Sequence, residues 1–248
     1  MRQAIGCPPR ASASGARYNE NMAFLVAASP VTIRCKGILF DMDGILISSL
    51  GSVERSWSRW AQMRGVAPER AVAIAHGRRA VETIAALRPD LDVDAELKVI
   101  EDIELADGKD IHALPGVVRL LATLPADRWT VVTSATERIA RMRIAAGGMA
   151  VPERLVTSET VTKGKPDPAP FLAGAKLLGF APEECVVFED SPSGARAGRA
   201  ARCTVVATTF SHSAKALEAA HYLVSDLTAV KVETEGGELT LHFTPRAA

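Results

Sequence analysis

Two aspartates separated by one residue, Asp41 and Asp43, give this sequence its clearest chemical signal. They follow the apolar run 37–40 and precede a glycine, which indicates a buried strand that ends in a polar turn. Ligands of open α/β sheets bind at the carboxyl ends of the strands. One carboxylate there can act as a nucleophile, the other can transfer a proton, and both can help to bind a hard cation. A calcium-binding loop starting at Asp41 is excluded, because Leu46 replaces the required Gly and Ser52 the required Glu.

Aspartate and glycine are also ordinary turn residues, so other parts of the chain must support this interpretation. Ser134 ends a run rich in β-branched residues, and Lys165 lies in the loop before a predicted helix. Glu189 and Asp190 end a third apolar run. In a parallel sheet these groups would meet Asp41 at one edge. The hydroxyl can donate to a phosphate oxygen, the lysine can neutralise the phosphate charge, and the carboxylates suit Mg²⁺, so the set indicates a site for a phosphate monoester.

Strands and helices alternate along most of the chain, which predicts an α/β fold with a parallel sheet and helices on both faces. One helix is expected to have Asp167 as its N-cap, Pro168 at its first position and Gly179 at its end. The other predicted elements are strands over 34–41, 129–134, 155–156, 185–189 and 204–207, helices over 117–124, over 136–146 and after Ser191, and a hairpin over 230–243.

The segment after the first predicted strand interrupts this alternation, because it indicates helices only. The apolar positions of its first predicted helix fall on one helical face: Val53, Trp57, Trp60 and Ala61. We therefore expect a chain of two parts, an α/β core domain over 33–47 and 114–248 and an all-helical cap domain inserted over 48–113.

The composition fits a soluble globular protein. Of the 248 residues, 48% are hydrophobic and 23% charged, and the formal net charge is zero, which argues against nucleic acid or an anionic membrane as the main partner. No apolar stretch approaches the roughly 18 residues needed to span a bilayer. The four cysteines include no C-x-x-C pair, and Cys35, Cys185 and Cys203 are expected to be buried free thiols, which fits a reducing cytoplasm.

Residues 1–32 carry Pro, Ser, Gly and Arg without periodicity, which predicts a disordered N-terminal extension. Met22 or Val31 could then be the real start of translation. The intact mass of the native protein tests this hypothesis, and a full-length mass would contradict it.

Four short motifs, in this order, resemble those of the haloacid dehalogenase (HAD) superfamily: Asp41-Met42-Asp43-Gly44, Thr133-Ser134, Gly164-Lys165-Pro166 and Glu189-Asp190-Ser191. The resemblance covers residues 34–230 and implies a Rossmann-like core, and the helical insertion is similar to the C1-type cap of the superfamily. Within the superfamily, the chain looks like the sugar phosphatases acting on hexose, hexitol, 2-deoxyglucose or glycerol phosphates. This closer resemblance is carried by the segment 34–43, by Trp57 and Trp60, and by the run 76–78.

The resemblance implies a Mg²⁺-dependent phosphatase in which Asp41 attacks phosphorus and forms an aspartyl-phosphate. Asp43 would protonate the departing alkoxide and then deprotonate the attacking water, a role that a halide leaving group would not require. Mg²⁺ would be bound by Asp41, the backbone carbonyl of Asp43 and Asp190, with Glu189 close by.

By the same resemblance, Ser134 and Lys165 would bind the substrate phosphate, although Lys165 taken alone could be a solvated loop lysine. Arg78 and Arg79 are the candidates for contacts between the cap and the substrate. His76 is expected to be structural, and the two tryptophans of the first cap helix are expected in the cap core.

The expected substrate is a small sugar, sugar-alcohol or cyclitol phosphate, because a helical cap must close over the site. No nucleic acid or membrane partner is expected, and the chain is expected to be a cytoplasmic monomer or small homo-oligomer. A phosphomutase of the β-phosphoglucomutase kind shares all four motifs and is the alternative. A catalytically silent sugar-phosphate-binding homologue is the third hypothesis, since Ile45 and Ser48 stand where Thr and Asp are common in the family.

Overall fold

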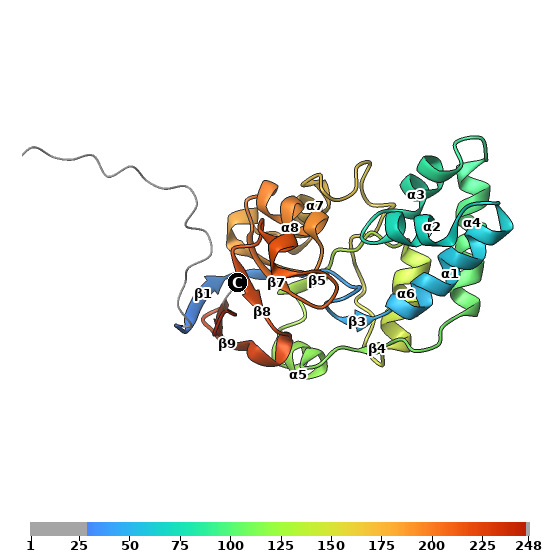
Figure 1. The fold of residues 1–248 in the computed structure, drawn as a ribbon. Coiled ribbons are helices and arrows are strands. Elements are labelled where there is room, and N and C mark those ends of the chain that lie inside the picture. The colour runs from blue at the N-terminus through green and yellow to red at the C-terminus, as the bar shows by residue number, and fades with distance from the viewer. Residues whose placement is uncertain (1–28, 247–248) are drawn as a thin grey trace, which may run out of the picture.

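A five-stranded parallel sheet forms the centre of the molecule (Figure 1). The computed structural model describes residues 29–246, and within them the sheet has the strand order β5-β2-β6-β7-β8. Its strands are β2 (Gly37–Phe40), β5 (Trp129–Val131), β6 (Cys185–Glu189), β7 (Thr204–Thr208) and β8 (Tyr222–Val224). Phe40 pairs with Val131 on one side and with Phe188 on the other, so the ends of β5, β2 and β6 stand level with one another. The predicted α/β fold is confirmed.

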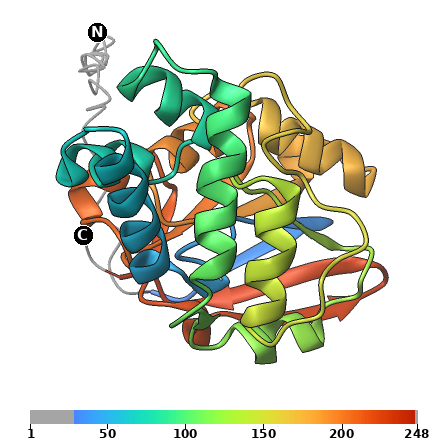
Figure 2. The same cartoon turned by 90° about the vertical axis from the view of Figure 1, so that its right-hand side faces the viewer.

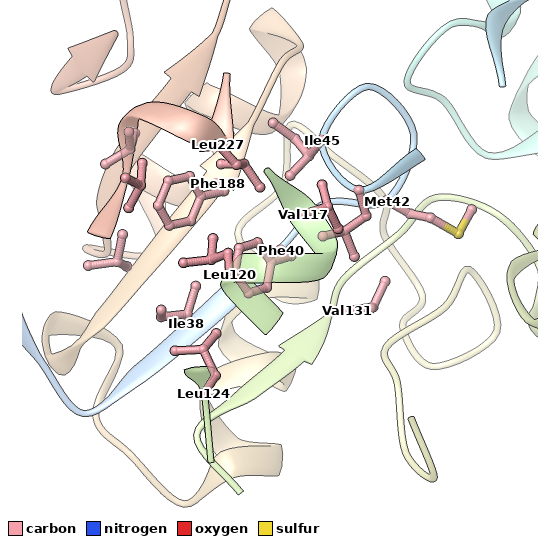
Figure 3. Close-up of a cluster of buried hydrophobic side chains, with 14 of the residues drawn as sticks. Ile38, Phe40, Met42, Ile45, Val117, Leu120, Leu124, Val131, Phe188 and Leu227 are labelled. Carbon is pink, nitrogen blue, oxygen red and sulfur yellow. The ribbon is translucent and has the colours of Figure 1, made fainter. Parts of the chain in front are cut away.

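Helices cover both faces of this sheet, as the alternation predicted. They are α5 (Val117–Thr123), α6 (Glu137–Ala146), α7 (Ala169–Leu178) and α8 (Pro192–Ala200). Successive side chains of a strand point to opposite faces, so Phe40 and Leu39 belong to separate hydrophobic clusters. Phe40 packs with Phe188 and with Leu120 of α5 (Figure 3), whereas Leu39 shares its cluster with Phe171 of α7.

Four helices form a second unit at the side of the sheet (Figure 1). They are α1 (Leu50–Met63), α2 (Pro68–Ala75), α3 (Ala80–Leu87) and α4 (Val93–Ala106), and they lie between β3 (Ile47–Ser48) and β4 (His112–Ala113), which pair antiparallel. This four-helix unit has its own hydrophobic cluster, in which Trp57 and Trp60 are buried as their spacing predicted. The helical insertion is therefore present, and its exact limits as a cap domain stay a prediction.

A three-stranded antiparallel sheet joins the two ends of the described chain. It consists of β1 (Val31–Cys35), β10 (Glu238–Phe243) and β9 (Lys231–Glu235), which confirms the predicted C-terminal hairpin. The prediction of a single strand over 34–41 is wrong, because this segment is divided between β1 and β2. The Lys36 N–H donates to the Glu184 carbonyl at 2.7 Å, and the chain passes there from the antiparallel sheet into the parallel one.

The start of the described chain also differs from expectation. β1 includes Val31 and Thr32, so the prediction of disorder is wrong for these two residues. Residues 1–28, which include Met22 and Cys7, lie outside the described residues.

Three smaller expectations need correction. The strand expected over 155–156 is a single bridge between Val132 and Val156, and β5 ends at Val131 rather than at Ser134. Pro168, not Asp167, occupies the N-cap position of α7, while the Asp167 carboxylate accepts from the Ala169 N–H at 2.9 Å. The end of α7 at Gly179 is as predicted.

The remaining described elements are short 3₁₀ helices: η1 (Pro182–Glu184), η2 (Ala214–Leu217) and η3 (Leu227–Ala229). Cys35, Cys185 and Cys203 are buried free thiols, as predicted. Between residues 29 and 246, no helix has both the length and the apolar character that a bilayer crossing needs.

Candidate active site

Asp41 lies at the carboxyl end of β2, where its N–H donates to the Phe188 carbonyl of β6 at 2.9 Å. The following loop is tight, because the Met42 carbonyl accepts from both Leu46 and Ile47. Gly44 within it has a φ of 85°, and a Cβ there would lie 1.8 Å from Asp190 Oδ2. Only a glycine therefore lets this loop lie against Asp190, which brings the first and the last motif together.

Lys165 lies between two carboxylates at the sheet edge. Its Nζ is 2.6 Å from Asp41 Oδ1, 2.6 Å from Glu189 Oε1 and 3.1 Å from the Val132 carbonyl, so all three of its protons have acceptors. Only 2% of the Lys165 side chain is exposed, which excludes a solvated loop lysine. Although burial opposes its charge, Asp41 and Glu189 raise the pKa of Lys165.

Glu189 is fully buried and uses both of its oxygens for hydrogen bonds. Oε1 accepts from Lys165, and Oε2 accepts from the N–H groups of Asp190 and Ser191 at 2.8 Å and from the Ser191 hydroxyl at 2.9 Å. A Cβ at Gly194 would lie 1.6 Å from Oε1, so this glycine in α8 makes room for the carboxylate. Glu189 thus holds Lys165 and the loop that carries Asp190.

A group of buried carboxylates offers a cation site. One oxygen each from Asp41, Glu189 and Asp190 lie within 4.8 Å of one another. Lys165 donates a hydrogen bond to Asp41 Oδ1, and the Ser211 hydroxyl donates one to Asp190 Oδ2. In the part of the chain that the structure describes, this leaves Asp41 Oδ2 and Asp190 Oδ1 without hydrogen bonds. Two open carboxylate oxygens are a donor set that fits a divalent cation such as Mg²⁺.

The electrostatics of this group also fit a cation. Burial raises the pKa of Asp41 to about 7, although Lys165 opposes the rise. Burial and the nearby charge of Glu189 raise the pKa of Asp190 well above its ordinary value. A bound cation would relieve both effects, because it favours the ionised carboxylates.

Asp43 is held by residues that the sequence analysis did not single out. Arg143 Nη1 of α6 donates to both Asp43 oxygens at 3.0 and 2.9 Å, and the Ser49 hydroxyl donates to Oδ1. Arg143 Nη2 donates to Glu104 Oε2 of α4 at 3.0 Å. The available signal was weak: Arg143 stands four residues after the buried Ile139, so it lies on the buried face of its helix.

One pocket brings most of the predicted residues together. It lies between the sheet edge and the four-helix unit, and its wall includes Asp41, Asp43, Ser134, Lys165, Asp190, Arg78, His76, Arg143 and Glu104. Glu189 lies behind this wall. The Ser134 hydroxyl donates to the Gly77 carbonyl at 3.2 Å, which links the sheet edge to the four-helix unit.

The two cap arginines have different surroundings. Arg78 lines the pocket, whereas Arg79 does not. Arg79 instead donates to the Val161 carbonyl at 2.9 Å and pairs with Glu82 at 2.7 Å. It therefore connects the four-helix unit to the loop before Lys165.

The chain is similar to several known proteins. Residues 35–202 match the family model "haloacid dehalogenase-like hydrolase". The chain is 46% identical over 180 residues to hexitol phosphatase A of Escherichia coli, covering 71% of this chain and 83% of that protein. It is 32% identical over 199 residues to glycerol-1-phosphate phosphohydrolase 2 of Saccharomyces cerevisiae, covering 75% and 80%. A hydrolase structure from Pseudomonas syringae matches with a TM-score of 0.69 and 27% identity, covering 77% and 93%.

Proposed function

The chain belongs to the haloacid dehalogenase-like hydrolases and is a phosphoric monoester hydrolase, and we propose that its substrate is a small sugar, sugar-alcohol or cyclitol phosphate. We further propose that it works with Mg²⁺ and through a phosphorylated Asp41. The names of its relatives, a hexitol phosphatase and a glycerol-1-phosphate phosphohydrolase, support the substrate class.

The observation that carries this proposal is how the two oxygens of the Asp41 carboxylate are bonded. Lys165 fixes Oδ1 at 2.6 Å, whereas Oδ2 has no hydrogen bond among the described residues, and Asp41 lines the pocket. A carboxylate with one oxygen fixed and one open is suited to attack phosphorus. Attack forms the Asp41–phosphorus bond and breaks the bond from phosphorus to the sugar oxygen.

Asp43 would serve both halves of the reaction. Its proton goes to the departing sugar oxygen, which would otherwise leave as an unstable alkoxide. The resulting carboxylate then takes a proton from the water that attacks phospho-Asp41, so that phosphate is released and Asp41 is restored. Asp43 lines the same pocket as Asp41, which supports this assignment.

The substrate phosphate would be bound by Ser134 and Lys165, the hydroxyl as a donor and the ammonium as a charge. Asp41, Asp190 and the carbonyl of Asp43 would bind Mg²⁺, which supplies positive charge that lets two anions, nucleophile and substrate, approach each other. Glu189, whose oxygens are already used, would act by holding Lys165 and the Asp190 loop.

The pocket wall supports a small hydroxylated substrate. The four-helix unit contributes apolar side chains, Trp57 and Ile100, next to polar ones, Arg78 and Glu101. Hydroxyl groups can bond to the charged side chains while carbon atoms pack against the ring. The four-helix unit covers the pocket, which would leave little room for a protein-sized phosphoester.

The test is phosphate release from a panel of hexose, pentose, hexitol, glycerol and cyclitol phosphates, with Mg²⁺ and with EDTA. We expect metal-dependent release from a few members and none from the Asp41→Asn variant. Isomerised sugar phosphate with little free phosphate, seen by ³¹P NMR, would instead identify the phosphomutase. Tight binding without turnover would identify the silent homologue.

A further inference from the structure

We propose that Arg143 is the positioning residue for Asp43, and that Glu104 holds Arg143 in place from the four-helix unit. This inference rests on the proposed function, in which Asp43 moves the proton. It makes the placement of the acid–base group depend on the packing of α4 against α6, which lie side by side in Figure 2.

The first argument is the set of bonds at Asp43. Arg143 Nη1 contacts both carboxylate oxygens, at 3.0 and 2.9 Å, so it restricts rotation of the carboxylate. The Ser49 hydroxyl donates to Oδ1 from the opposite end of the loop. Asp43 lies outside the named strands, and its backbone forms a single bridge with Ile47, so its side-chain bonds add to the rigidity that a catalytic group needs.

The second argument is the burial of Arg143. Only 5% of its side chain is exposed, and burying a charge is costly unless it is paired. Its partners are Asp43 and Glu104, and its Nε has no hydrogen-bond partner among the described residues. Here the two carboxylates set its position.

The third argument is a comparison with another ion pair between the same helices. Arg138 of α6 pairs with Asp102 at 3.0 Å and with Glu101 at 3.5 Å, both in α4. This pair is on the surface, since 52% of the Arg138 side chain is exposed, and it does not contact Asp43. The exposed pair therefore holds α4 against α6 without reaching the site, whereas the buried Arg143–Glu104 pair also contacts Asp43, the proposed proton-transfer group.

A consequence for turnover follows from the position of Glu104. It is buried at 7% exposure and belongs to the unit that covers the pocket. Separation of α4 from α6 would remove this partner from Arg143 and loosen the group that fixes Asp43. Asp43 would thus be held for proton transfer only while the four-helix unit covers the bound substrate, when water is excluded.

The test compares the first turnover of two phosphate esters. The first ester is sorbitol 6-phosphate, or the alkyl phosphate that the panel ranks first; its leaving group is an alkoxide, which requires a proton. The second is p-nitrophenyl phosphate, whose leaving group is a stable phenolate. We expect Arg143→Met to slow the first turnover of the alkyl ester about 10²-fold, the lower end of general acid catalysis, and that of the nitrophenyl ester by less than about 3-fold. Arg143→Lys should recover part of the loss.

Two matched variants separate positioning from structure. Asp102→Asn weakens the 3.0 Å surface pair with Arg138 between the same helices at a residue outside the pocket wall, and it should leave both first turnovers unchanged. In an Asp43→Asn background, Arg143→Met should add no further loss, because the two residues act as one unit. If Arg143→Met does not fold, Glu104→Gln, which keeps the size of the side chain, should show the same selective loss at about 10-fold.

Equal slowing of both esters by Arg143→Met or Glu104→Gln would overturn the positioning role. A selective loss of alkyl-ester turnover in Asp102→Asn, as large as that in Arg143→Met, would overturn it too. Either result would leave the phosphatase assignment intact. No phosphate release from the unmodified chain with any ester would instead overturn the proposed function and this inference with it.

Discussion

Lys165→Met is the substitution for which the structure gives the clearest energetic expectation. Lys165 is buried between Asp41 and Glu189, with 2.6 Å to an oxygen of each. Methionine has a similar length and no charge, so the variant leaves two carboxylates buried without their cation. Removing one partner of a buried ion pair costs about 3–5 kcal/mol of unfolding free energy.

The expected loss can be measured as a melting temperature. For a chain of this size, 1 kcal/mol corresponds to roughly 2–4 °C, so Lys165→Met should melt about 6–20 °C lower in EDTA. Mg²⁺ should recover part of this loss, because a cation near Asp41 and Asp190 supplies the missing positive charge. The loss should be larger at pH 8 than at pH 6, where the buried carboxylates can bind protons instead.

Lys163→Met is the matched control, two residues away. Lys163 is 75% exposed and its Nζ lies 3.8 Å from Asp167, so its removal should change stability by no more than about 0.5 kcal/mol. Equal melting temperatures of the two variants in EDTA would refute the buried pair. So would a large loss for Lys163→Met alone.

Further predictions concern the nucleophile, its pKa and the glycine beside Glu189. Asp41→Asn should fold and bind substrate but release no phosphate, and turnover near that of the unmodified chain would exclude Asp41 as nucleophile. The pKa of Asp41 is raised from 3.8 to about 7, so the folded, metal-free chain keeps a proton that the unfolded chain releases. The unfolding free energy should therefore fall as pH rises from about 4 to about 7. Urea unfolding midpoints measured in EDTA should accordingly be lower at pH 8 than at pH 6. Asp41→Asn should reduce this difference between the two pH values. Gly194→Ala should cost about 1–3 kcal/mol and most of the activity, because the new Cβ would displace Glu189. Gly108→Ala, where a Cβ meets nothing within 4 Å, should be nearly neutral in the same denaturation and phosphate-release assays.

Local sequence patterns were sufficient to predict which edge of the sheet carries the candidate site. An apolar run followed by a polar turn fixes where a strand ends, and this depends only on residues close in the sequence. β6 ends at Glu189 as predicted, and β2 ends one residue before Asp41. Since parallel strands in register end at the same level, the order of the motifs was enough to predict that Asp41, Ser134 and Asp190 share one pocket.

The same patterns could not assign strands to sheets. β1 and β2 are separated only by Lys36, and both are rich in apolar residues, so they were expected as one strand. Their separation depends on β10, more than 200 residues later, which pairs with β1. The burial of β1 alternates along the strand whereas β2 is buried throughout, but such a pattern indicates only which faces are covered and not which distant strand is the partner.

The sequence alone was enough to name the candidate reacting groups, whereas the tertiary structure decided how those groups are held. Arg143 and Glu104 meet only because α4 packs against α6, and no local motif contains both. Arg79 likewise binds the Val161 carbonyl instead of lining the pocket. The reason is physical: a strand end is set by neighbouring residues, whereas the partner of a buried charge is set by how two separate elements pack.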